Sequence, residues 1–276
     1  MRKWAGAVAL TSLCAIVLPA TSIAGCGSFD AGEVATTTPP ESGPGADAAT
    51  PLPDADTSVD ATGDAPCTVM TVAIEATADT SFASTCAGTI TNGGTDNMHV
   101  GSDNGAGVGL VRFDLGDDTA AKLEGRRIIG GRLRLHSNPN CQVCGLGLAA
   151  QSGTMTVHPL RPDWDEGTSG GLAAGADRCR RAKGTGWGAV DRAPSSETKI
   201  TGGGVDFDET SDSALVAADT DELTVDLRPE VISARGSIAA KRVAFLLRMV
   251  SGGRMIVATH EEGAALAPLL EIDACE

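Results

Sequence analysis

The chain has 276 residues and a formal net charge of −15, and aromatic residues make up 3% of it. A chain this acidic is a poor match for nucleic acid, because phosphate neutralisation requires clustered Lys and Arg. We therefore expect no nucleic-acid partner. The length is enough for one folded domain together with non-globular segments.

Residues 1–25 have the pattern of an export signal. Arg2 and Lys3 precede an apolar stretch that is short for a membrane span, and small residues lead up to Cys26. The sequence Ile-Ala-Gly-Cys at 23–26 resembles the bacterial lipobox, in which the cysteine is diacylated and becomes the new N-terminus. We predict lipidation of Cys26, which would anchor the exported protein to the cell envelope, at the outer membrane or cell surface. An ordinary signal peptide with a fortuitous cysteine is the alternative.

Residues 26–66 are expected to form a disordered tether. The segment is rich in Ala, Thr, Pro, Gly and Asp, and it has no Lys or Arg. Such a composition buries too little apolar surface to offset the entropy of ordering, and Pro and like charges keep the chain extended. The folded domain is then residues 67–276.

Six cysteines remain in this domain, and an even number in an oxidising compartment predicts disulfides. They are Cys67, Cys86, Cys141, Cys144, Cys179 and Cys275. Cys67 opens the domain and Cys275 closes it, so we expect these two to pair. The pairing of the other four stays open.

Alternating apolar and polar residues separated by turn residues indicate an all-β domain. Strands are expected at 71–77, 108–115, 132–136, 154–160, 223–227, 243–250, 254–260 and 267–272. One short helix is expected within 229–240. Two stretches interrupt the alternation: 137–153, and the long Gly-rich stretch 167–222, which we expect to be a functional loop or a partly ordered excursion.

A series of short motifs in this domain resembles the DNRLRE-type β-sandwich family. They are Ala-Asp-Thr at 78–80, His-Val-Gly at 99–101, Val-Arg-Phe-Asp-Leu at 111–115, Gly-Arg-Leu-Arg-Leu at 131–135, Asp-Trp-Asp-Glu-Gly-Thr at 163–168, Trp187, Val-Asp-Leu at 225–227, Val-Ala-Phe-Leu-Leu at 243–247, Thr-His-Glu at 259–261 and Pro-Leu-Leu-Glu at 268–271. That family is also classed among carbohydrate-binding modules, with alginate binding described for a member. The resemblance implies a jelly-roll-like antiparallel β-sandwich, for which the pattern suggests about nine strands. The chain departs from the family in its Cys-bearing insertions and its lack of Tyr.

Two kinds of residue are candidates for glycan binding. Trp164 and Trp187 are the tryptophans of the mature chain; they could stack on sugars or could pack in the core. Outward basic residues of several strands could hold an acidic polysaccharide through bidentate bonds, or could pair with nearby carboxylates. These are Arg112, Arg132, Arg134, His136, Arg248, Arg254 and His260.

Signals for metals and catalysis are weak. Asp96, Asn97, Asp103 and Asn104 could hold a structural Ca²⁺, but turn-forming residues explain them equally well. Cys141 and Cys144 could bind zinc with Cys179 and His136, although disulfides are the preferred interpretation. No nucleophile elbow or metal-binding His pair is found, so we expect neither a cofactor nor an enzyme.

The leading hypothesis is a non-catalytic, surface-displayed lipoprotein that binds envelope or matrix polysaccharide, and we expect it to prefer acidic chains. The alternative is a structural or adhesive lipoprotein that binds a protein partner.

Overall fold

The computed structural model describes residues 67–82, 97–101, 107–138, 150–167, 175–195, 197 and 199–276. The chain divides into two units, Met1–Val59 and Asp60–Glu276, and every described residue belongs to the second. The signal segment and the whole expected tether, including Cys26, lie outside the described residues. No helix in the described ranges is long and apolar enough to cross a membrane.

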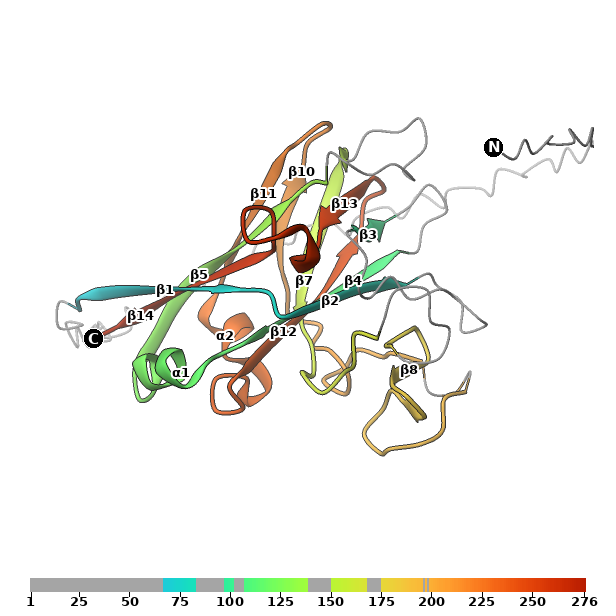
Figure 1. The fold of residues 1–276 in the computed structure, drawn as a ribbon, viewed down its shortest axis with the longest axis horizontal. Coiled ribbons are helices and arrows are strands. Elements are labelled where there is room, and N and C mark those ends of the chain that lie inside the picture. The colour runs from blue at the N-terminus through green and yellow to red at the C-terminus, as the bar shows by residue number, and fades with distance from the viewer. Residues whose placement is uncertain are drawn as a thin grey trace, which may run out of the picture. The chain divides into compact units, whose positions relative to one another are not determined.

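Two antiparallel sheets form the body of the domain (Figure 1). The first sheet has the order β1 (Val69–Glu75), β14 (Leu269–Cys275), β5 (Arg127–His136), β11 (Glu222–Leu227). The second has the order β10 (Asp212–Val216), β7 (Gly153–Pro159), β12 (Arg242–Met249), β4 (Val108–Asp114), β2 (Ala78–Phe82). The all-β, antiparallel sandwich expected from the sequence is confirmed.

Smaller elements complete the described part of the domain. A third sheet has the order β3 (Asn97–Gly101), β13 (Arg254–Ala258), β6 (Ala150–Gln151), and β8 (Arg180–Ala182) pairs with β9 (Thr185–Gly186). The helical elements are α1 (Asp117–Leu123), α2 (Pro229–Ile232), η1 (Ala234–Gly236) and η2 (His260–Glu262). The short helix expected within 229–240 corresponds to α2.

All eight predicted strands are present, with ends that differ by a few residues. The described residues form fourteen strands, more than the nine or so expected, because β2, β3, β6, β8, β9 and β10 lack a clear alternation. The jelly-roll connectivity stays a prediction.

The main core lies between the two large sheets and follows from period-two patterning. In β11, Leu223, Val225 and Leu227 are buried, whereas the residues between them face solvent. The rings of Phe113 and Phe245 meet edge to face in this core, with centroids 6.2 Å apart. The core thus fixes which side chains of the first sheet point outward.

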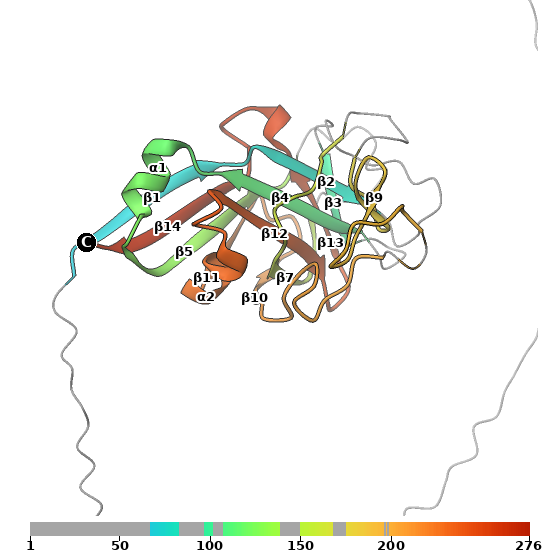
Figure 2. The ribbon, with the colours of Figure 1, turned by 90° about the horizontal axis from the view of Figure 1, so that it is seen from below.

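A second core covers the outer face of the second sheet, and described residues between Leu160 and Phe207 supply much of it. Strand β12 is buried at every position from Val243 to Leu247, which shows that both of its faces are covered. The covering residues are Leu160, Trp164, Ala176, Trp187 and Phe207, and they pack on Ala78, Phe82, Leu110, Ala244 and Leu246. Described parts of the stretch expected to be a loop are therefore an ordered cover for the sheet, seen beside β8 in Figure 1 and β9 in Figure 2.

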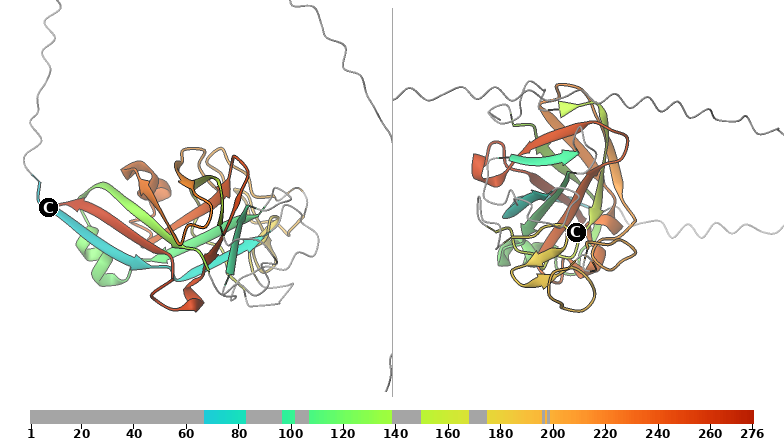
Figure 3. Two further views of the ribbon diagram at one scale, coloured as in Figure 1. Left: turned by 90° about the horizontal axis from the view of Figure 1, so that it is seen from above. Right: turned by 90° about the vertical axis from the view of Figure 1, so that its right-hand side faces the viewer.

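The two ends of the domain are joined. Cys67 and Cys275 form a disulfide with a Cα–Cα distance of 5.4 Å, and β1 pairs with β14 from Val69 opposite Cys275 onward. This confirms the predicted bridge. Both strands lie beside α1 at the same end of the domain (Figures 2 and 3).

Candidate functional site

The arginines predicted to bind a ligand are divided between the two sheets. Arg132 and Arg134 project from the outer face of the first sheet, on β5, because their neighbours Leu133 and Leu135 fill the core. Arg112 and Arg248 belong to the second sheet, on β4 and β12. The four arginines therefore do not form one ridge.

The outer face of the first sheet carries the residues that we call the charged face. They are Arg132, Arg134 and His136 of β5, Glu222, Thr224 and Asp226 of β11, and Glu271 and Asp273 of β14. Arg132 Nε lies 2.9 Å from Glu271 Oε2, and Arg134 donates from Nε and Nη2 to the two Glu222 oxygens at 2.9 and 3.0 Å. The bond from Arg134 also lowers the pKa of Glu222. Both arginines therefore pair with carboxylates of neighbouring strands, which was the second of the two interpretations offered for them from the sequence.

Arg112 lies against Trp164, a residue of the second core. The Trp164 side chain is buried, with 1% exposure, and the Arg112 guanidinium lies 5.3 Å from the centre of its ring. Arg112 Nη1 also donates to the Trp164 carbonyl at 2.6 Å. Of the two roles considered for Trp164, the structure therefore shows packing in the core rather than an exposed stacking face.

Trp187 is buried as well, with 1% exposure, and its indole N–H donates to the Asp177 carbonyl at 2.6 Å. Of the two roles considered for Trp187, this burial contradicts stacking on sugars and shows packing in the core. The indole belongs to the second core, on the outer face of the second sheet. Arg248, by contrast, is exposed on β12.

The remaining cysteine and calcium predictions fall mostly outside the described residues. Cys179 is disulfide-bonded, which removes it as a zinc ligand. Cys86, Cys141 and Cys144 lie outside the described ranges, as do Asp96, Asp103 and Asn104 of the calcium hypothesis. Asn97, the fourth residue of that hypothesis, begins β3.

A group of four side chains that the sequence analysis did not connect meets at the edge of the second sheet. We call Asp79, Glu166, His260 and Glu261 the carboxylate–imidazole cluster. Asp79 comes from the edge strand β2, Glu166 follows Trp164, and the other two lie in η2. One ligand-capable atom from each side chain lies within 4.8 Å of the corresponding atoms of the others.

Hydrogen bonds fix this cluster. His260 donates its backbone N–H to Asp79 Oδ2 at 2.9 Å, and its Nδ1 lies 3.1 Å from the same oxygen. The backbone N–H of Asp79 donates to Glu166 Oε1 at 2.9 Å. The strand edge and the η2 turn therefore hold three of the side chains in a fixed relation.

Burial and mutual repulsion alter the acidity of the cluster. Burial raises the pKa of Asp79, and it raises the pKa of Glu166 to about 7, with further contributions from the neighbouring carboxylates. The hydrogen bond with Asp79 raises the pKa of His260 to about 9. The cluster thus concentrates negative charge around one imidazole.

Each member lies in a motif used for the family resemblance: the Ala-Asp-Thr of 78–80, the Trp-bearing stretch 163–168, or the Thr-His-Glu of 259–261. Their place in these motifs was the sequence signal that could have pointed to the four residues. Recognising that they form one cluster required the fold, because the three motifs are far apart in the sequence.

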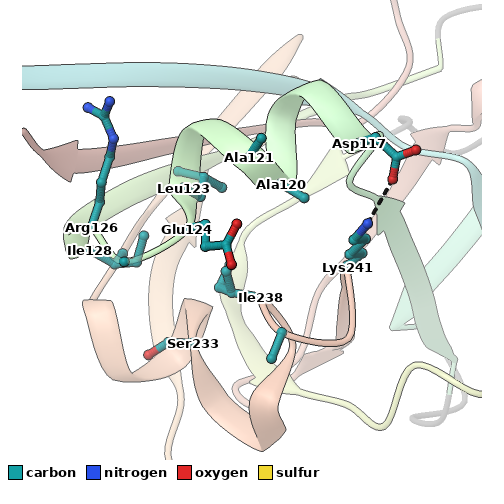
Figure 4. Close-up of a pocket in the computed structure, with 12 residues that line it drawn as sticks. Asp117, Ala120, Ala121, Leu123, Glu124, Arg126, Ile128, Ser233, Ile238 and Lys241 are labelled. Atoms are coloured by element: carbon teal, nitrogen blue, oxygen red, sulfur yellow. Dashed lines mark hydrogen bonds and ion pairs between the residues drawn. The ribbon is translucent and has the colours of Figure 1, made fainter.

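An open groove lies between α1 and the segment that follows α2 (Figure 4). Its volume is about 640 Å³, and Ala120, Leu123, Ile128 and Ile238 supply much of the lining. At one end, Lys241 Nζ donates to Asp117 at 2.7 Å. The groove is therefore an apolar recess with an ion pair at one end.

Comparison with known proteins gives no relative: no family model matches the sequence, and no curated protein matches it.

Proposed function

We propose that this chain is a lipid-anchored envelope protein whose β-sandwich, a module of the DNRLRE type, binds acidic polysaccharide without catalysis. The charged face carries the proposal. It is an uncovered sheet surface among the described residues, whereas residues 160–207 cover much of the opposite sheet.

The two arginines of this face are suited to hold carboxylates in sequence along a chain. They are two residues apart on one strand, so their side chains leave the sheet roughly 6.6 Å from each other. Arg132 and Arg134 retain 46% and 36% side-chain exposure beside their carboxylate partners. A guanidinium has five N–H donors, so one that is fixed by a single carboxylate still has donors for a second.

Polar neighbours on the same face would contact sugar hydroxyls. Thr224 and Asp226 are exposed beside these arginines, in register with Arg134 and Arg132. Because both tryptophans are buried, binding on this face depends on charge and hydrogen bonds rather than on aromatic stacking. The guanidinium groups favour carboxylate-bearing glycans at short range, whereas the four carboxylates of the same face and the net charge of −15 oppose them at long range. Salt screens both the contacts and this repulsion, so we expect binding to be local and weak.

Isothermal titration of the chain with a polyuronate and with a neutral glucan tests this function. Each charge-assisted contact contributes about 1.5–3 kcal/mol, so Arg132→Ala/Arg134→Ala should weaken uronate binding by at least about tenfold. Arg242→Ala is the matched control, since Arg242 is an exposed arginine with one carboxylate partner, Asp114, on the other sheet. Equal binding of both glycans, or no loss in the double variant, would contradict the proposal.

The anchor has its own test. Cys26→Ser should move the protein from the membrane fraction to the soluble fraction, because the acyl chains are then absent. A variant that still partitions fully with membranes would show that Cys26 is not the attachment point.

A second function, adhesion to a protein partner, is favoured by the apolar groove beside α1. Under this function both glycans give no heat in the titration. Ala121→Trp, which fills the groove, would then abolish adhesion by cells that display the protein, and Arg132→Ala/Arg134→Ala would leave adhesion unchanged.

A further inference from the structure

We infer that the carboxylate–imidazole cluster is a divalent metal site that takes zinc or a similar first-row ion, bound by Asp79, Glu166, His260 and Glu261. The site is separate from the charged face, and it stands whether or not the domain binds glycan.

The distances around His260 match a metal site. Nδ1 of this residue lies 3.1 Å from Asp79 Oδ2, 3.3 Å from Glu261 Oε2 and 3.6 Å from Glu166 Oε1. Ligand atoms at roughly 2.0–2.2 Å from a tetrahedral zinc lie roughly 3.3–3.6 Å from one another. These three spacings are therefore near those of a formed site, and the remaining ligand atoms lie within 4.8 Å of one another.

A buried oxygen without a partner gives independent support. The Asp79 side chain is fully buried, and its Oδ2 accepts both bonds from His260. Its second oxygen, Oδ1, is buried in the same carboxylate and has no hydrogen-bond partner. An unsatisfied buried carboxylate oxygen is costly, and an absent ion is one of the accepted explanations.

The charge balance of the cluster also favours a cation. Three carboxylates surround a single imidazole, and their ion pairs in the described part of the chain are all with His260. A divalent ion supplies the positive charge that these carboxylates otherwise lack. Glu166, His260 and Glu261 are partly exposed, which leaves an entry path from solvent.

The donor set decides the class of ion. Calcium takes six to eight oxygen ligands, whereas imidazole is a preferred ligand of zinc, iron and nickel. A set of one nitrogen and three carboxylates therefore favours a first-row ion over calcium. We expect Zn²⁺ to bind the cluster more tightly than Ca²⁺.

Calorimetric titration of the chain with Zn²⁺, Mn²⁺ and Ca²⁺, after removal of bound metal by a chelator, tests the site. One Zn²⁺ should bind per chain and raise the melting temperature. His260→Gln and Glu261→Gln should each weaken Zn²⁺ binding at least tenfold; both residues are partly exposed, so these variants are expected to fold. Glu262→Gln is the control, because Glu262 lies in the same turn but accepts a bond from Asn138 instead.

X-ray absorption of the zinc-loaded chain should show only nitrogen and oxygen ligands. Three results would overturn the inference: no stoichiometric Zn²⁺ binding, binding that survives both variants, or Ca²⁺ binding as tight as Zn²⁺. None of these readings depends on a glycan, so failure of the metal site and failure of the proposed function are distinguishable.

Discussion

His158 shows how a single polar side chain is placed beneath the second core. It lies on β7, nearly fully buried, with its ring packed edge to face against Phe207 at 5.4 Å between centroids. Nδ1 lies 3.0 Å from the Asp208 carbonyl and Nε2 lies 3.1 Å from Thr156 Oγ1. Burial lowers the pKa of this imidazole, aided by Arg248, against the opposing effects of the Asp208 carbonyl and Glu209.

This lowered pKa predicts that acid destabilises the domain. The unfolded imidazole takes up a proton near pH 6.5, whereas the folded one resists protonation. The contribution of His158 to stability is therefore full above about pH 6.5 and falls as the pH drops toward the folded pKa. Urea unfolding at several pH values should show that the free energy of unfolding falls less below neutral pH for His158→Gln than for wild type. An identical fall in both proteins would contradict the lowered pKa of His158.

The candidate binding residues could be predicted from sequence only in part. Alternation with buried leucines placed Arg132 and Arg134 on one outward face of β5, as the structure shows. Their partners Glu222 and Glu271 come from strands that pair across long sequence distances, which a local pattern does not reveal. The same holds for His260, which was grouped with the sheet arginines but lies in η2 beside Asp79.

The segment from Leu160 to Phe207 is the element with the least regular structure and a large share of the second core. Polar bonds hold it: Asp206 is fully buried and accepts from the backbone N–H groups of Gly188 and Thr201 at 2.9 Å each. Arg181 pairs with Asp163 at 2.7 Å and with Asp191. Such bonds can order a segment that has few regular strands.

We predict that Trp187→Ala destabilises the domain by about 3–5 kcal/mol, since removing a buried aromatic leaves a cavity. Val190→Ala is the control in the same segment, because Val190 is 64% exposed and should change stability by less than about 0.5 kcal/mol. Denaturant unfolding measures both. In Trp187→Ala, hydrogen exchange of backbone amides should rise first around position 187 and along β12. Equal stabilities of the two variants would mean that the indole is not core.

Among the elements, those with strong periodicity were predictable and those that depend on their neighbours were not. Strands β4, β5, β11 and β12 carry clear apolar patterns, so their positions followed from sequence. The edge strand β2 is buried at every position, including Asp79 and Thr80. It is enclosed by the second core and by the η2 turn, which come from distant parts of the sequence. No local pattern contains that information.

At the scale of the whole molecule, the first and last strands are neighbours joined by a covalent bond. The Cys67–Cys275 bridge closes a loop with a sequence separation of 208 residues. In the chain-entropy model a loop of this length contributes about 5 kcal/mol by restricting the unfolded chain. The bridge thus joins the two ends of the domain at Cys67, where the expected tether ends.

Removal of this bridge in Cys67→Ala/Cys275→Ala should lower the free energy of unfolding by up to about 5 kcal/mol. Urea unfolding of the variant against wild type measures the loss. The single variant Cys275→Ala, which frees Cys67, checks that the effect comes from the bond rather than from either side chain. An unchanged midpoint would show that the bridge adds nothing to the pairing of β1 with β14.

Binding of acidic polysaccharide to the charged face of the first sheet can be tested by mapping where a ligand contacts the chain. Backbone amide chemical shifts should be recorded by NMR while a short polyuronate is added to the chain. We expect the shift changes to concentrate on the outward residues of β5, β11 and β14, around Arg132 and Arg134. Changes confined to the groove beside α1 or to the 160–207 segment, or none at all, would contradict it.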